Sequence, residues 1–454
     1  MSAGAAGAAG PDGRAPAGGR SREDDGPPAR LHGGASHARL RRVERFLWSA
    51  SRGAGAGWLA PAGAAVGAAA AARGALAHAS RARLARPVVS VGGLSAGGAG
   101  KTPVARLVAE MLRAHGARVA VLTRGHPDVR RGDPPLVVLP PREGRPPGRT
   151  GGGAEGGARP AGPDAAPGGA RPAGARAVPD EALLFARDGI PVGAHPVRAR
   201  AAAALARAGA TPDVYVLDDG FGHRSLEREL DLVVLSWRDL HAPPRPFPAG
   251  PFREGWTSLR RTARVVIAGL DASRASALVA EARSDPPLHG PRRRGGDRAT
   301  GGAAPAATDA ALARVTAAAG EPPILAVLEP APAVELEAWR TGAADAAVAP
   351  GEAAAFSGIA DPAAFERTLA QAGWRVRAHL VFPDHHRYGA RDLRRAADLR
   401  PRGGVLVTTE KDAARLPPGA FPPGACAVLP VRARIVRGAD ALAGDLARLT
   451  GGAP

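Results

Sequence analysis

Short apolar runs that end in glycine alternate with longer amphipathic stretches along the middle of the chain. The first run, PVVSVGG at residues 87–93, is rich in β-branched residues and predicts a buried strand. Between Thr102 and Gly116, apolar residues recur at a spacing of three and four, which predicts a helix that stops at the glycine. The run ARVAVLT at 117–123 predicts the next strand. This order of strand, glycine-rich loop, helix and strand is typical of a parallel α/β sheet.

The same alternation continues through two further parts of the chain. Up to residue 283, helix or strand patterns occupy the segments 179–192, 201–210, 213–220, 230–236 and 263–270. After residue 322, strand and helix patterns alternate again at 322–330, 361–382, 390–399 and 404–416. The sequence carries no internal repeat, so we expect two different α/β units rather than a repeat array.

Three stretches lack this periodicity and are rich in glycine, proline, alanine and arginine. Such stretches bury too little apolar surface to offset the entropy lost on ordering the chain, so we expect only about 300 folded residues. The expected organisation is a disordered tail at 1–38, a helical and membrane-associating segment at 40–86, an α/β domain at 87–283 with a disordered insertion at 140–178, a low-complexity linker at 284–321 and a smaller C-terminal α/β domain at 322–450.

The formal net charge of +19 has two interpretations. A composition biased toward arginine and alanine produces such a charge without functional meaning, whereas a positive surface can also serve an anionic membrane or a phosphorylated substrate. No motif for binding RNA or DNA stands out, and we expect no nucleic-acid partner. Only two of the 61 basic residues are lysines, Lys101 and Lys411, which indicates sites where a compact ammonium is needed in place of a guanidinium.

The segment before the first predicted strand mixes arginines with apolar residues. In LRRVERFLWSASRGAG, the residues Leu40, Val43, Phe46 and Leu47 recur at a helical spacing. A basic helix of this kind can lie on a membrane surface, and it can equally pack on the next domain. No run of 18 apolar residues occurs, so we expect no well-formed transmembrane helix. The single cysteine, Cys426, leaves no internal disulfide and fits a reducing compartment.

Residues 95–102, SAGGAGKT, match a phosphate-binding loop except at the first position. The consensus is G-x-x-x-x-G-K-[ST], and a serine stands where the first glycine is expected. In such loops backbone N–H groups bind phosphate, the lysine reaches the β- and γ-phosphates, and the final hydroxyl ligates Mg²⁺. The predicted nucleotide-binding residues are Ser95, Ala96, Gly97, Gly98, Ala99, Gly100, Lys101 and Thr102. A structural glycine-rich turn that binds no ligand is the alternative.

Carboxylates end or begin two other predicted elements. The apolar run VYVLDDG ends in Asp218 and Asp219, the layout in which an aspartate at a strand tip binds Mg²⁺. Asp180 and Glu181 stand where a helix begins; the helix dipole alone favours them there, and a base near a transferred phosphoryl group is the other interpretation. The segment FPDHHRY offers His385, which is a candidate to orient such a base or to bind a metal.

These motifs stand in an order that resembles the tetraacyldisaccharide 4'-kinase family of lipid A synthesis. The glycine loop is followed by TRGH, DEALL, LDDGFGH, FPAGPFRE, AFSGIADPAAFERTL, FPDHH and VLVTTEKDAARL, within residues 87 to 416. The family's loop reads S-V-G-N-L-T-x-G-G-T-G-K-T-P, so a hydroxyl residue at the position of Ser95 is its norm. Eight motifs in one order argue against a chance match.

The resemblance implies an enzyme on the cytoplasmic face of the inner membrane, with ATP and Mg²⁺ as its cofactors. Such an enzyme moves the γ-phosphoryl group of ATP to the 4'-hydroxyl of a lipid A disaccharide 1-phosphate. The implied fold is a P-loop NTPase-like parallel sheet with helices on both faces, and we expect a monomer. The residues that match the family's motifs are Asp180 as catalytic base, His385 paired with it, Glu181 beside it, Arg253 at phosphate or substrate, and Asp218 and Asp219 as Mg²⁺ ligands.

The sequence departs from the family at four positions. Gly93 stands where the family has asparagine, His126 where it has tyrosine and Gly222 where it has glutamine, and Pro179 replaces the glycine before the Asp-Glu pair. The first three changes remove polar or aromatic contacts near nucleotide or substrate, so we expect a difference in affinity or acyl specificity.

Two other functions compete with the kinase. A P-loop ATPase or GTPase that acts as a switch would explain the glycine loop and the paired aspartates. It would leave FPDHH and AGPFRE without a role. A basic nucleic-acid-binding ATPase would predict salt-sensitive binding through the arginine-rich tracts.

Overall fold

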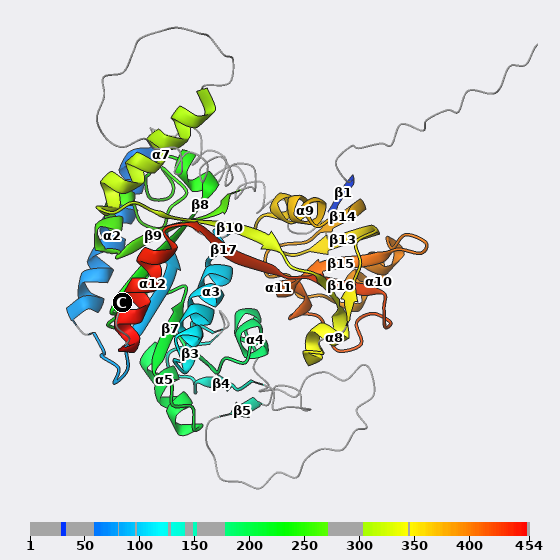
Figure 1. The fold of residues 1–454 in the computed structure, drawn as a ribbon, viewed down its shortest axis with the longest axis horizontal. Helices are drawn as coiled ribbons and strands as arrows, with labels where there is room; N and C mark the ends of the chain where they lie inside the picture. The colour runs from blue at the N-terminus through cyan, green and yellow to red at the C-terminus, as the bar shows by residue number, and fades with distance from the viewer. Residues whose placement is uncertain are drawn as a thin grey trace, which may run out of the picture.

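The computed structural model of the chain contains two sheets, and each sheet has its own helices (Figure 1). The structure describes residues 29–32, 59–79, 81–95, 98–125, 129–140, 149–151, 178–270, 303–343 and 346–451. The mixed α/β class and the parallel sheet expected from the sequence are confirmed.

The larger sheet has a parallel centre with antiparallel strands at both edges. Its order is β17 (Val431–Arg437), β10 (Ile324–Pro330), β9 (Arg264–Leu270), β8 (Leu230–Ser236), β2 (Val88–Gly93), β7 (Val214–Asp218), β3 (Val119–Thr123), β6 (Val192–Ala194), β4 (Leu136–Val138) and β5 (Arg149–Gly151). The seven strands from β10 to β6 run parallel, whereas β17, β4 and β5 pair antiparallel with their neighbours. The strand β2 therefore lies near the middle of the sheet, directly beside β7.

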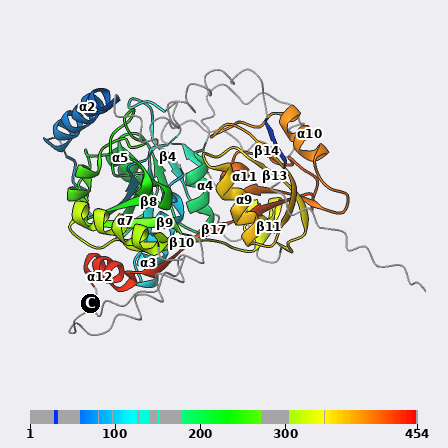
Figure 2. The same cartoon turned by 90° about the horizontal axis from the view of Figure 1, so that it is seen from above.

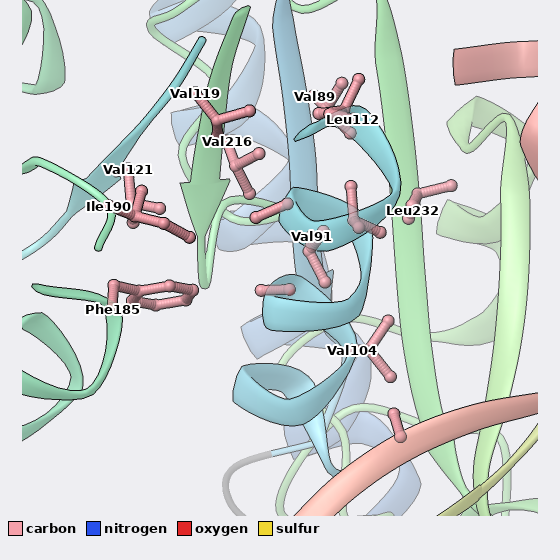
Figure 3. Packing of buried hydrophobic residues seen from close by; sticks show 14 of the residues in the cluster. Val89, Val91, Val104, Leu112, Val119, Val121, Phe185, Ile190, Val216 and Leu232 are labelled. Atoms are coloured by element: carbon pink, nitrogen blue, oxygen red, sulfur yellow. The ribbon is translucent and has the colours of Figure 1, made fainter. Parts of the chain in front are cut away.

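Helices cover both faces of this sheet because its strands are apolar on both sides. The helices are α2 (Ala60–Ala79), α3 (Lys101–Ala114), α4 (Asp180–Arg187), α5 (Arg198–Arg207), α7 (Ala303–Ala319) and α12 (Ala439–Thr450), with short 3₁₀ helices η2 (Trp237–His241) and η3 (Trp256–Arg261). In β2, Val89 and Val91 pack with α3, α4 and α12, whereas Val88 packs with α5. Figure 3 shows Val104 and Leu112 on the face of α3 that meets the strand residues.

The smaller sheet is also mostly parallel. Its order is β1 (Ala29–His32), β14 (Arg375–Val381), β13 (Glu352–Ser357), β15 (Val405–Thr409), β16 (Cys426–Leu429), β11 (Ala333–Glu335) and β12 (Ala347–Val348). Its helices are α8 (Leu336–Thr341), α9 (Pro362–Gln371), α10 (Ala390–Asp398) and α11 (Glu410–Ala413). We call this sheet and its helices the small domain, and the rest of the described fold the large domain. Figure 2 shows the two lobes side by side.

The boundary between the domains differs from the division at residue 322. The strands β10 and β17 and the helix α12 belong to the larger sheet and its cover, although the sequence places them in the C-terminal unit. The chain enters the small domain between Pro330 and Ala333 and leaves it between Leu429 and Val431. The cause is topological, because the sequence pattern of a strand does not show which sheet the strand will join through its hydrogen bonds.

Three stretches expected to lack structure contain elements. Residues 29–32 of the tail form β1, and 149–151 of the insertion form β5. Within the stretch expected to be a linker, residues 303–319 form α7, which packs its apolar side on η2, η3 and β9. Alanine-rich stretches have high helix propensity, and a buried contact then stabilises them. The rest of the tail, and residues 141–148 and 152–177 of the insertion, lie outside the described residues.

The helical segment expected at 40–86 is represented by α2. Residues 40–58, which hold the basic apolar pattern, lie outside the described residues. Gly63 lets α2 approach the loop after η2 closely, since a Cβ there would lie 2.7 Å from the Cβ of Ala249. Among the described helices, none is both long and apolar enough to cross a membrane.

Candidate active site

A cleft of about 1020 Å³ separates the large and small domains. From the large domain, the glycine loop, the start of α4 and the end of β7 line it. From the small domain, the start of α9, the loop after β14 and α11 line it. Most residues assigned from sequence motifs therefore meet in one place, although they lie up to 287 positions apart in the printed sequence.

The glycine loop joins β2 to α3 as the motif predicts. Gly100 caps the N-terminus of α3 with φ of 79°, and Gly98 has φ of 66°, a region that favours glycine because it has no Cβ. The first backbone N–H groups of a helix have no partner within the helix and favour an anion. Gly98, Ala99, Gly100, Lys101 and Thr102 line the cleft at this point. Ala96 and Gly97 lie outside the described residues.

The side chain of Ser95 anchors the loop rather than lining the cleft. It is fully buried, and its Oγ donates a hydrogen bond of 3.0 Å to Oδ2 of Asp239. The same carboxylate accepts from the backbone N–H of Ser236 and closes the cap of η2. The hydroxyl group at the first loop position thus has a structural partner inside the large domain.

Lys101 and Arg253 both pair with Asp219. The Lys101 ammonium lies 3.1 Å from Oδ1 of Asp219, and an Arg253 nitrogen lies 3.3 Å from Oδ2. Burial alone raises the pKa of the Asp219 carboxyl, but the two cations outweigh burial and hold the pKa below its usual value. Asp219 is therefore an anion at neutral pH, and it contacts the lysine of the glycine loop.

Asp218 has the opposite electrostatic environment. Its side chain is 4% exposed, and Oδ1 has no hydrogen-bond partner among the described residues. Burial, followed by the charges of Glu181 and Asp219, raises the pKa of Asp218 to about 7. A buried carboxylate oxygen without a partner next to a second carboxylate is a place where a divalent cation fits. Thr102, buried at the start of α3, lines the same cleft as Asp218 and Asp219.

No cluster of three or more histidine, cysteine or acidic side chains suited to a metal ion occurs within the described ranges. Mg²⁺ characteristically uses one or two carboxylates and completes its shell with water and substrate phosphates. The donor set of Asp218, Asp219 and Thr102 fits that requirement.

Asp180 and Glu181 begin α4 and face two cations of the small domain. Asp180 Oδ2 forms an ion pair with Arg415, and Glu181 Oε1 lies 3.2 Å from the Lys411 ammonium. Burial raises the pKa of the Asp180 carboxyl. A hydrogen bond with Glu181 and the charges of Arg415 and Lys411 outweigh it, so the pKa lies well below its usual range. Asp180 is thus held as an anion although it is 9% exposed.

His385 lies beside Asp180, but the two side chains are farther apart than a hydrogen-bonded dyad would be. Its Nδ1 is 3.9 Å from Oδ2 of Asp180 and 3.3 Å from an Arg415 nitrogen. The residue has φ of 58°, which is unusual for a side chain with a Cβ, and its ring is 60% exposed toward the cleft. The adjacent His386 points elsewhere: it pairs with Asp392 at 3.0 Å.

Arg415 has no role in the sequence prediction, although it lies in the motif VLVTTEKDAARL. Lys411 is one of only two lysines, and its contact with Glu181 gives it a role. Because arginine is the common basic residue of this chain, residue type does not single out Arg415, and only its place in the motif could have indicated it.

A family model described as tetraacyldisaccharide-1-P 4'-kinase matches residues 55–147 and 164–450. The chain belongs to this family. The resemblance drawn from the motifs is thereby confirmed, together with the kinase class that it implied.

Relatives and a solved structure agree with this membership. The tetraacyldisaccharide 4'-kinase of Anaeromyxobacter sp. (strain Fw109-5) is 35% identical over 376 residues, covering 81% of this chain and 83% of the relative. That of Gluconacetobacter diazotrophicus is 35% identical and covers 87% and 86%. The crystal structure of LpxK from Aquifex aeolicus in complex with ATP has a TM-score of 0.55 and 23% identity, covers 87% of this chain and 99% of that one, and shows the shared fold.

Proposed function

We propose that this chain transfers the γ-phosphoryl group of ATP to the 4'-hydroxyl of tetraacyldisaccharide 1-phosphate, the step that forms lipid IVA in lipid A biosynthesis. One observation carries the proposal. The phosphate-type loop with Lys101 and the paired aspartates at the end of β7 line the same cleft as Asp180 and His385. Transfer of a phosphoryl group to a hydroxyl group requires a nucleotide-binding site and an acid–base pair in one cavity.

ATP binds with its phosphates at the start of α3. The backbone N–H groups from Gly98 to Thr102 donate hydrogen bonds to the phosphate oxygens, and Lys101 exchanges its contact with Asp219 for a contact with the β- and γ-phosphates. The exchange leaves Asp219 free to face a cation. Asp218, Asp219 and Thr102 would hold Mg²⁺, and the bound ion would neutralise charge on the phosphates.

Asp180 is the base for the acceptor. As the 4'-oxygen attacks the γ-phosphorus, its proton passes to a carboxylate oxygen of Asp180. The bond between the γ-phosphorus and the bridging oxygen breaks, and ADP leaves with that electron pair. The low pKa of Asp180 keeps the carboxylate ionised before the reaction. His385 borders the same carboxylate, and Arg253 at the mouth of the cleft supplies positive charge to phosphate or substrate.

The enzyme works at the cytoplasmic face of the inner membrane as a monomer. On α2, Leu76 is 74% exposed and Val66 is 40% exposed. Phe247, 37% exposed, lies on the loop that α2 packs against through Pro246. Exposed apolar side chains on one helix and its neighbouring loop, in a chain of net charge +19, support contact with an anionic lipid surface.

The switch function finds less support. A nucleotide switch needs the glycine loop and the aspartates of β7, but it does not need a second carboxylate and a histidine across the cleft. The position of His385 on a strained backbone, 3.9 Å from Asp180, favours catalysis on an acceptor.

The test is transfer of labelled γ-phosphate from ATP with Mg²⁺ to detergent-solubilised tetraacyldisaccharide 1-phosphate. We expect a lipid-soluble labelled product with the wild type and with Asp309→Asn, an exposed aspartate of α7. Asp180→Asn should lower the rate by about 10²-fold or more, since general-base catalysis contributes 10²–10⁴-fold. Phosphate release without lipid and without labelled product would contradict the proposal and favour the switch.

A further inference from the structure

Two cations of the small domain face the two carboxylates that begin α4. Arg415 pairs with Asp180, and Lys411 lies 3.2 Å from Glu181. Both cations come from α11 and the turn that follows it, after β15. The large domain thus presents the acidic pair, and the small domain presents the basic pair.

The guanidinium of Arg415 is fixed from behind. One nitrogen donates to the carbonyl of Gly358 at 3.0 Å and to Oδ1 of Asp412 at 3.3 Å. Asp412 is fully buried, and its carboxylate accepts from the N–H of Gly358 at 3.0 Å and the hydroxyl of Tyr388 at 2.7 Å. These hydrogen bonds restrict the rotamers of the Arg415 side chain. The other terminal nitrogen of its guanidinium group therefore has a defined direction.

That second nitrogen contacts both members of the expected dyad. It pairs with Oδ2 of Asp180 and lies 3.3 Å from Nδ1 of His385. A guanidinium can only donate hydrogen bonds. The Nδ1 atom facing it therefore carries a lone pair, and the proton of a neutral His385 ring is on Nε2, the nitrogen on the side of Asp384.

We propose that Arg415 is a positioning residue for the kinase reaction, which fixes the orientation of the Asp180 carboxylate and the tautomer of His385. This inference rests on the proposed role of Asp180 as base. Because Arg415 belongs to the small domain, the base of the large domain is complete only when the two domains meet at this contact.

The charges around Asp180 give the proposal a measurable consequence. Glu181 from its own helix, Arg415 and Lys411 from the α11 segment, and His385 from the loop after β14 face it. Burial raises the pKa of Asp180, whereas the hydrogen bond with Glu181 and the charges of Arg415 and Lys411 lower it. Without Arg415, burial retains its full effect and one cation is lost. The pKa of Asp180 then rises, so the carboxylate protonates at a higher pH.

The experiment compares Arg415→Gln and Arg415→Lys with the wild type in the lipid phosphorylation assay between pH 3 and pH 9. Arg434→Gln is the matched control, since Arg434 also forms a carboxylate ion pair but on the exposed edge strand β17. We expect Arg415→Gln to lower kcat at pH 7 at least tenfold, with the KM for ATP within twofold of wild type. Its acidic limb in kcat should move up by about one to three pH units.

Arg415→Lys keeps the charge but loses the fork, so it should retain the wild-type acidic limb and still lose kcat. Thermal unfolding will show whether Arg415→Gln is folded. If it is not, Arg415→Lys still tests the proposal. An acidic limb and kcat equal to wild type in both variants would overturn the proposal for Arg415. If Asp180→Asn is inactive in the same assay, the proposed base stands while Arg415 is rejected; if Asp180→Asn is fully active, the proposed base itself is wrong.

Discussion

Arg106 of α3 and Glu410 of α11 form an ion pair of 2.9 Å that joins the two domains beneath the cleft. The Arg106 side chain is 2% exposed, and its other face binds Asp188 at the end of α4 through two nitrogens, at 2.5 and 2.7 Å. Glu410 is also approached by Arg432 at 3.3 Å, at the point where the chain returns to the large domain. One arginine therefore holds together the helix of the glycine loop, the helix of the proposed base and the segment that carries Lys411.

Replacing Arg106 should destabilise the fold more than a typical surface substitution. Arg106→Met would leave the half-buried carboxylate of Asp188 and the buried carboxylate of Glu410 with fewer partners, and breaking a buried pair in this way costs about 3–5 kcal/mol. Urea unfolding of the variant and of Arg434→Gln measures the difference. A loss below about 1 kcal/mol for Arg106→Met would show that the two carboxylates find other partners and that this contact is not central.

Lys101 should not be replaceable by arginine. The ammonium reaches Asp219 within a confined space, where Gly93 leaves room: a Cβ on Gly93 would lie 3.0 Å from Cδ of Lys101. We expect Lys101→Arg and Lys101→Met both to lower kcat by about 10²–10³-fold, the cost of losing one preorganised charge contact. Steady-state assays measure kcat. Circular dichroism should show an unchanged fold, and near wild-type activity of Lys101→Arg would contradict the argument from lysine rarity.

His223 should make stability fall on mild acidification. Burial first, and then the charges of Arg198 and Arg228, lower the pKa of His223 to about 3, from an ordinary value near 6.5. Its contribution to stability is therefore present above pH 6.5 and is lost as pH falls toward 3. In this range His223 binds a proton in the unfolded chain but stays neutral in the folded chain.

The measurement is urea unfolding at pH 7.5 and pH 5. The wild type should lose up to about 2 kcal/mol through His223 over this interval, and His223→Gln should lose correspondingly less. His115→Gln, which removes a histidine at the exposed end of α3, is the control and should behave as the wild type. Equal pH dependence in all three proteins would exclude His223 as the source.

Gly222 should accept the side chain that the family carries there. A Cβ at Gly222 would meet no heavy atom within 4 Å, so Gly222→Gln should change stability by no more than about 0.5 kcal/mol. The added amide lies next to His223 on the loop after β7, and we expect it to lower the KM for the lipid acceptor by up to about tenfold, the effect of one hydrogen bond. Kinetics with ATP and lipid varied separately test this; a change confined to the KM for ATP would argue against an acceptor-side role.

The strand–loop–helix unit could be predicted because its signals are local. The β-branched run of β2, the glycines of the loop and the three-and-four spacing of α3 are each contained in fewer than 20 residues. Gly98 and Gly100 do adopt the left-handed conformation for which glycine is needed. The domain division failed for the converse reason. The strands β10 and β17 pair with each other at the edge of the larger sheet although more than 100 residues separate them.

The chemical groups proposed for catalysis could be read from the chain alone: the backbone of a phosphate-type loop, a lysine, two pairs of carboxylates and a histidine. This was possible because these signals depend on residue type and on spacing within single elements. Which charges face one another depends on how the two sheets are placed in space. Arg415 and Asp180 are 235 positions apart, and their contact exists because a strand from each sheet ends at the same cleft. In a chain whose basic residues are almost all arginine, the motif that contains Arg415 does not show which carboxylate it contacts; the arrangement of the two sheets does.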